Sequence, residues 1–203
     1  MTRRQWLILG SLGLVVIVLF IALIYVLLTA PSGTGALLPA RQRAYSAPVA
    51  AVTAKSAYGL AQETALKWQA DAYLVSVSAT WRQATLNMFR DPVAWGLQFY
   101  SPSTNRLHIY VVSGGEVKSL RESRSSYQLA AVTDETWQVD SPQALAEWLN
   151  AGGGRFLQTH TLADVWATLR YDKKQGQVMW NISGLDSAGN DFLSLPVKAG
   201  PQE

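Results

Sequence analysis

The first feature of the hydrophobic pattern is a continuous apolar run near the N-terminus. Trp6–Leu28 contains mainly Leu, Ile, Val and Phe, and no charged residue occurs between Gln5 and Leu28. As a helix, this run would extend about 35 Å at about 1.5 Å per residue, enough to cross a hydrocarbon core of about 30 Å. The pattern predicts a transmembrane helix.

Two other interpretations of this run are weaker. A buried helix of a soluble domain would need a core large enough to cover all its faces. A cleaved signal peptide has a shorter apolar region, of about 7–15 residues, followed by a small-residue cleavage site. Here the longer run ends in Leu28-Thr29-Ala30 before Pro31, which favours an uncleaved anchor.

The flanking charges predict the orientation of this anchor. Arg3 and Arg4 precede the run directly, and the next cations lie more than a dozen residues beyond it. The positive-inside rule then keeps residues 1–29 as a cytoplasmic tip and membrane helix, and exports the remainder. Residues 6–28 would contact the lipid bilayer. The expected anchor and orientation residues are Arg3, Arg4, Trp6 and Tyr25.

A linker and two helices are expected next. The Pro- and Gly-containing stretch 30–47 is typical of a linker. Small residues then recur at spacings of three and four from Ala50 to Trp68, which predicts a helix that packs closely on a sheet. A second helix is expected to have Ser141 as its N-cap and to end at Gly152–Gly154.

Alternation of apolar and polar residues predicts the strands. The clearest alternation runs from Tyr73 to Trp81, with Val75, Val77 and Ala79 between them on one face. Further strands are expected at 93–99, 107–112, 165–171, 178–182 and 192–197, and 127–132 is a candidate for another.

The same order of elements occurs twice along the chain, which indicates an internal duplication. A shift of 85 residues aligns the pairs Trp81 and Trp166, Trp95 and Trp180, Asn105 and Asn190, and Val112 and Val197. A shift of 80 aligns the helices, with Trp68 on Trp148, and the difference corresponds to an insertion at 151–155. Chance alignment of two Trp pairs is the alternative.

These patterns together predict an α+β fold: a single N-terminal transmembrane helix followed by two tandem α-β-β-β repeats, 48–132 and 133–203. The repeats could share one sheet or form two. Most exported Trp side chains are expected in the core, because a small domain needs their apolar mass. The functional alternative is a ligand or partner surface formed by Trp81, Trp95, Trp166 and Trp180.

The arrangement of helix, Trp-bearing strand, polar turn and closing strand in 50–115 and 141–200 resembles tandem PepSY-like modules, small extracytoplasmic units of membrane-anchored bacterial proteins. The acidic residue and glycine that close such modules are present as Gly115-Glu116 but are replaced by Gly200-Pro201 in the second unit. The resemblance implies a non-catalytic binding or regulatory module, often acting on a peptidase or an assembly at the membrane.

Composition and charge exclude several function classes. The chain has no cysteine, which excludes disulfides, Cys-ligated metals and thiol catalysis. Of 17 Lys and Arg residues, removal of Arg3 and Arg4 leaves 15 against 14 Asp and Glu, so the exported part is nearly neutral. The basic isoelectric point is therefore no indication of nucleic-acid binding.

The candidate chemistry is sparse. The two histidines, His108 and His160, are expected in a solvent-facing strand position and in a loop or strand edge, and only a concave site that joins one of them to a carboxylate would indicate an enzyme. The polar run 186–191 is typical of a β-turn more than of a calcium loop. We find no catalytic motif and expect no enzyme activity, no cofactor and no metal.

The sequence therefore predicts a membrane-anchored extracytoplasmic protein-interaction module, an accessory or regulatory subunit of a membrane-associated complex. It would be held in the cell membrane by one span, with its C-terminal domain periplasmic or at the cell surface, and would bind another membrane or extracytoplasmic protein and no nucleic acid. The alternative is an extracytoplasmic sensor or binding domain for an amphipathic small molecule.

Overall fold

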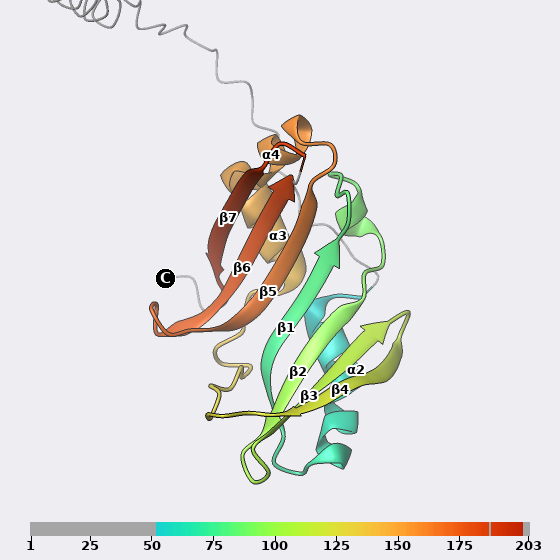
Figure 1. Cartoon of the computed structure of the whole chain (residues 1–203), viewed down its shortest axis with the longest axis vertical. Coiled ribbons are helices and arrows are strands. Elements are labelled where there is room, and N and C mark those ends of the chain that lie inside the picture. The colour runs from blue at the N-terminus through green and yellow to red at the C-terminus, as the bar shows by residue number, and fades with distance from the viewer. Residues whose placement is uncertain (1–51, 187, 201–203) are drawn as a thin grey trace, which may run out of the picture. The chain divides into compact units, whose positions relative to one another are not determined.

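The computed structural model describes residues 52–186 and 188–200, which lie within one compact unit of the chain (Figure 1). The predicted anchor, with Arg3, Arg4, Trp6 and Tyr25, and the predicted linker 30–47 lie outside the described residues. Within the described part, no helix is both long and apolar enough to cross a membrane.

Seven strands form one antiparallel sheet in the order β4-β3-β2-β1-β5-β6-β7 (Figure 1). The strands are β1 (Tyr73–Trp81), β2 (Trp95–Ser101), β3 (Arg106–Ser113), β4 (Glu116–Arg124), β5 (Asp164–Asp172), β6 (Gln177–Asp186) and β7 (Asp191–Lys198). The α+β class is confirmed. Because β1 pairs with β5, the strands of both halves of the chain belong to a single sheet.

Helix α2 (Ala54–Trp68) forms as the spacing of small residues predicts. Thr53 caps its first turn: its side chain accepts a hydrogen bond from the Ser56 amide, and the Ser56 side chain accepts one from the Thr53 amide. The alanines that face the sheet have no exposed surface, so the helix backbone lies close to the strands. They are Ala54, Ala57, Ala61 and Ala65.

Helix α3 (Ser141–Trp148) differs from the prediction at both ends. Its N-cap is Asp140, whose carboxylate accepts the Ser141 amide hydrogen at 2.6 Å. The glycine run does not end the helical segment. A wide π-type turn, Leu149–Gly153, leads into helix α4 (Gly154–Thr159), because Gly152 at φ 138° bends the chain without stopping it.

The N-termini of α2 and α3 meet at Asp140, and both helices cover the same face of the sheet, behind the strands in Figure 1. Besides capping α3, the Asp140 carboxylate accepts the Lys55 amide hydrogen of α2 at 3.1 Å. Ser141 Oγ accepts the Ala54 amide hydrogen at 3.0 Å. The positive ends of two helix dipoles therefore converge on one carboxylate, which stabilises both ends.

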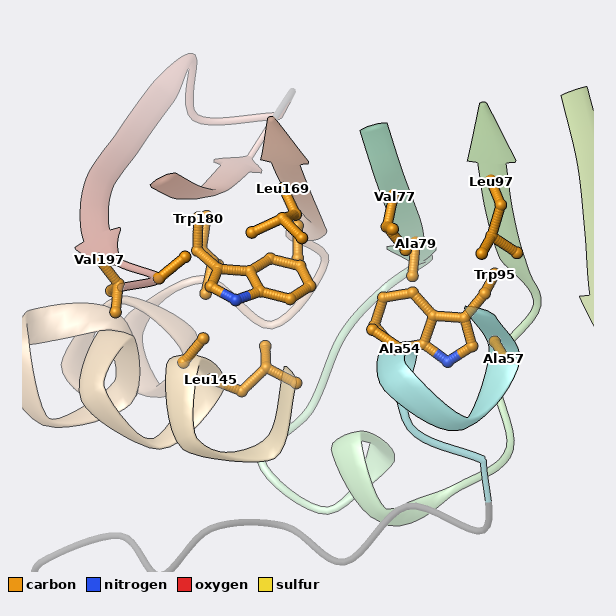
Figure 2. Close-up of a cluster of buried hydrophobic side chains, with 14 of the residues drawn as sticks. Ala54, Ala57, Val77, Ala79, Trp95, Leu97, Leu145, Leu169, Trp180 and Val197 are labelled. Carbon is orange, nitrogen blue, oxygen red and sulfur yellow. The ribbon is translucent and has the colours of Figure 1, made fainter. Parts of the chain in front are cut away.

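Two indole rings occupy corresponding places under these two helices (Figure 2). Trp95 Nε1 donates to the carbonyl oxygen of Val52, just before the cap of α2, at 2.9 Å. Trp180 Nε1 donates to the carbonyl oxygen of Val139, just before the cap of α3, also at 2.9 Å. The ring centroids lie 6.3 Å apart in an edge-to-face arrangement at the centre of the core.

The shift of 85 residues describes β2–β3 and β6–β7 correctly. Trp95 and Trp180 are both buried, Val112 and Val197 are both buried, and the turn residues Asn105 and Asn190 have φ of 52° and 56°. The shift fails before β2. Trp81 points to the helix-covered face, whereas Trp166 points to the opposite one, because thirteen residues join β1 to β2 and only four join β5 to β6.

The alignment of Trp68 with Trp148 is also wrong. The corresponding helix positions are the N-caps Thr53 and Asp140, which a shift of 87 relates. Trp68 ends a helix of 15 residues and is partly buried, whereas Trp148 ends one of 8 residues and is fully buried. The two tryptophans therefore differ in both distance from the cap and environment.

The fourth strand of the first half lies at Glu116–Arg124 and not at 127–132. Gly114 and Gly115, both with positive φ, turn the chain back along β3 and place the charged β4 at the sheet edge. Residues 125–132 then cross the end of the sheet, and the Val132 amide donates to the Leu74 carbonyl oxygen at 2.8 Å.

Both edges of the sheet are protected against a further strand. In β4 the pairing with β3 shifts register beside Ile109, and most of its side chains are charged. In β7, Pro196 has no amide hydrogen to offer a neighbour. A partner would therefore contact a face of this sheet more readily than an edge.

Candidate binding face

The side of the sheet opposite α2 and α3 faces the viewer in Figure 1. Strand register places mostly polar residues on this side. We call it the open face. Strand register and alternation identify its residues. Buried residues such as Val77 and Leu169, which pair across β1 and β5, point to the helices, and the residues before and after them in each strand point to the open face. Its central members are Ser76, Ser78, Gln98, Ile109, Val111, Trp166, Thr168, Arg170, Asn181, Phe192 and Lys198.

One transverse row of the open face concentrates positive charge. Read across the strands from β4 to β7, the paired residues are Arg121, Ile109, Gln98, Ser76, Arg170, Met179 and Lys198. The row holds three cations and no acid. Among the described residues, no carboxylate oxygen lies within 4.0 Å of Arg121, Arg170 or Lys198.

The positive charge of this row comes from the placement of the cationic side chains and not from a net positive charge of the domain. The chain has 17 Lys and Arg and 14 Asp and Glu. Without Arg3, Arg4, Arg41, Arg43 and Glu203, which lie outside 52–200, 13 of each sign remain. A band without acids on a neutral domain gives that face a local positive potential.

A cleft of about 620 Å³ lies over the middle of this row. Ser76, Gln98 and Arg170 contribute to its lining from the sheet, and residues 125 and 127–130 contribute from the crossing segment. That segment is held in place by Tyr73, whose hydroxyl donates to the Leu129 carbonyl oxygen at 2.8 Å. Lys173 Nζ lies 5.5 Å from the ring centroid of Tyr127 at the same cleft.

Two aromatic side chains lie together elsewhere on the open face. Trp166 of β5 is partly buried, and its ring centroid is 6.0 Å from that of Phe192 on β7. Phe192 is 60% exposed, an unusual environment for so large an apolar side chain. This pair adds an apolar contact area to the polar, positively charged cleft.

The predicted surface of four tryptophans does not form. Trp81, Trp95 and Trp180 are 5%, 1% and 0% exposed on the helix-covered side, and only Trp166 reaches the open face. Strand alternation explains the difference, since side chains of opposite parity point to opposite faces. Figure 2 shows Trp95 and Trp180 surrounded by alanine and aliphatic side chains of the core.

His108 is buried and not solvent-facing as predicted. It points toward α2 and stacks on Tyr110, with ring centroids 4.2 Å apart, while Trp68 packs edge-on at 4.9 Å. His108 Nε2 lies 2.8 Å from Ser119 Oγ, and its Nδ1 has no hydrogen-bond partner among the residues that the structure describes. Burial lowers the pKa of His108, and the negative charge of Glu122 opposes that effect.

A pH dependence of stability follows from His108. Because its folded pKa is lowered from the ordinary value of about 6.5, the unfolded chain takes up the proton first as the pH falls. We expect stability to be lost from about pH 6.5 downward, before the carboxylates protonate. Thermal unfolding at pH 7.5 and 5.5 should show a smaller pH-dependent drop in His108→Gln than in the wild type. Equal drops in both proteins would contradict this assignment.

The second histidine, His160, contacts two carboxylates. The spacing of residues in the sequence did not reveal these contacts. His160, at the end of α4, lies 3.0 Å from Asp186 Oδ2 through Nδ1 and 3.8 Å from Asp191 through Nε2. The hydrogen bond with His160 lowers the pKa of Asp186 most, and the amides of Ala188 and Gly189 lower it further. A shallow hollow of about 320 Å³ lies beside the ring.

This arrangement connects α4 to the β6–β7 turn, and it joins a histidine to carboxylates beside a hollow, as the criterion for an enzyme requires. Both ring nitrogens of His160 face carboxylates, which leaves neither directed at a nucleophile. The neighbouring Thr159 hydroxyl bonds to helix carbonyl oxygens. No group of three or more His, Cys, Asp or Glu side chains in the described part of the chain could hold a metal ion.

Comparison with known protein families, characterised proteins and solved structures gave no match. The PepSY-like resemblance therefore depends on the order and spacing of the elements alone.

Proposed function

We propose that this chain is a membrane-anchored extracytoplasmic protein that binds a partner protein through the open face of its sheet, as an accessory or regulatory subunit. The observation that carries the proposal is the set of side chains gathered there. Tryptophan, tyrosine, phenylalanine and arginine are enriched at protein interfaces, and the open face presents Trp166, Phe192, Tyr127 and Arg170.

The apolar run 6–28 and the Arg3–Arg4 pair support the anchor and its orientation. The corresponding cap and indole contacts of Val52 and Val139 support the inference that two copies of one helix-plus-strands unit form the exported domain. The blocked edges β4 and β7 favour binding at a face over strand addition.

Site-specific photo-crosslinking in intact membranes tests this function. We expect a photoreactive residue at Val111, on the open face, to form discrete adducts with a partner protein. The same residue at Glu63, an exposed position of α2, should form none. The Trp166→Ala substitution should reduce the Val111 adducts several-fold. Adducts at both positions to the same extent, or at Glu63 alone, would contradict the proposal.

A further inference from the structure

We propose that the cleft beneath residues 125–130 binds the carboxylate groups of an extended acidic segment of the partner, with Arg170 as the principal contact. This inference rests on the proposed function and specifies the chemistry of the partner. It starts from three cations in register, Arg121, Arg170 and Lys198, that no carboxylate of the described residues neutralises.

The cleft has the hydrogen-bonding groups for such a ligand. Arg170 offers a planar guanidinium group that can bind a carboxylate through two parallel hydrogen bonds. The neighbouring Ser76 and Gln98 side chains make no hydrogen bond within the described part of the chain, and they lie on the cleft floor. These groups are available for the second carboxylate oxygen or for a peptide amide.

The one acid of the cleft lining does not neutralise Arg170. Asp172 Oδ1 accepts the backbone amide hydrogens of Lys174 at 2.7 Å and Gln175 at 3.2 Å. This oxygen is thereby engaged in the β5–β6 turn, and no ion pair within 4.0 Å joins Asp172 to Arg170. The adjoining Lys173 and Lys174 add positive charge at the same end of the cleft.

Strand geometry predicts a spacing for the acidic residues. Neighbouring strands lie about 4.8 Å apart, so Arg170 on β5 is about 10 Å from the Lys198 position on β7 and about 19 Å from Arg121 on β4. A peptide in the polyproline II conformation advances about 3.1 Å per residue and places every third side chain on the same side. An acidic side chain three residues from the one at Arg170 would therefore lie at Lys198, and another six residues away in the opposite direction would lie at Arg121.

An anionic bilayer is the competing source of negative charge. The position of Arg170 favours a peptide, because this residue lines a cleft bounded by the crossing segment, and a narrow chain enters such a cleft more readily than a flat lipid surface. The bilayer is kept as an outcome of the test.

The test uses the full chain in phosphatidylcholine nanodiscs and a fluorescent decapeptide with blocked ends, Glu at positions 1, 4, 7 and 10, and Ser elsewhere. Fluorescence anisotropy should show saturable binding that weakens with salt, and little binding of the peptide with Gln in place of Glu. A Gln peptide with a free C-terminal carboxylate tests whether one terminal carboxylate suffices; binding as tight as that of the Glu peptide would overturn the assignment to acidic side chains.

Arg170→Gln should weaken binding of the Glu peptide about tenfold. Arg90→Gln removes an exposed cation outside the open face and should change it less than twofold. Equal effects of the two substitutions, or equal binding of the Glu and Gln peptides, would overturn the inference. Binding of the protein to phosphatidylglycerol vesicles without binding of the Glu peptide would also overturn it. One result would separate the two proposals. If the wild type does not bind the Glu peptide and the Arg170→Gln variant still forms the Val111 adducts, the carboxylate site is refuted and the proposed function remains intact.

Discussion

Replacing Trp180 by alanine is expected to lower the free energy of unfolding by about 3–5 kcal/mol, because a fully buried indole is removed from the centre of the core. The ring packs against Trp95 and Trp137, with centroids 6.3 Å away in each case. A domain of this size has a total stability of about 5–15 kcal/mol, so the loss is a large part of it. Urea unfolding of the full chain, followed by far-ultraviolet circular dichroism, measures the change.

Trp166→Ala is the matched control for this prediction. It removes the same side chain from the open face, where the ring contacts Phe192 and is partly exposed, and should cost about 1 kcal/mol or less. If Trp180→Ala does not fold, Trp180→Phe keeps the comparison measurable with a smaller loss. Similar losses at positions 166 and 180 would contradict the assignment of one ring to the core and the other to a binding surface.

Local patterns predicted most of the elements because burial on one face sets a residue period. Alternation located β1, β5 and β7 to within about a residue or two, and alanine spacing located α2. Strand β4 was missed since charged residues occupy five of its nine positions, and it owes its conformation to pairing with β3. An edge strand that buries little has no apolar period to detect.

The candidate site was harder to predict, because it depends on register between strands far apart in the sequence. Arg121, Arg170 and Lys198 have no common local spacing, and only the six strand pairings place them in one row. A shift by one position in a strand moves a residue to the other face. Trp81 and Trp166 point to opposite faces because thirteen residues follow β1 and only four follow β5. The contact of His160 with Asp186 likewise depends on the bend at Gly152, which sets the direction of α4 and so the position of His160. The run of glycines in the sequence did not reveal that direction.

Gly153→Ala is expected to lower the free energy of unfolding by about 1–3 kcal/mol through steric overlap alone. Gly153 has helical backbone angles, φ −57° and ψ −37°, which alanine adopts readily. The added Cβ would, however, overlap the indole ring of Trp148, which has no exposed surface and packs against Phe89 at a centroid distance of 6.4 Å. The ring has little room to move, because interiors are close-packed.

Gly59→Ala provides the opposite expectation in the same domain. Gly59 lies inside α2, and a Cβ there would meet no atom within 4 Å, so alanine should stabilise the protein by about 0.5–1 kcal/mol. Combining Gly153→Ala with Trp148→Leu should show a favourable coupling, because the smaller side chain leaves room for the methyl group. Stabilisation by Gly153→Ala, or strict additivity with Trp148→Leu, would show that the π-type turn does not pack its backbone against this ring.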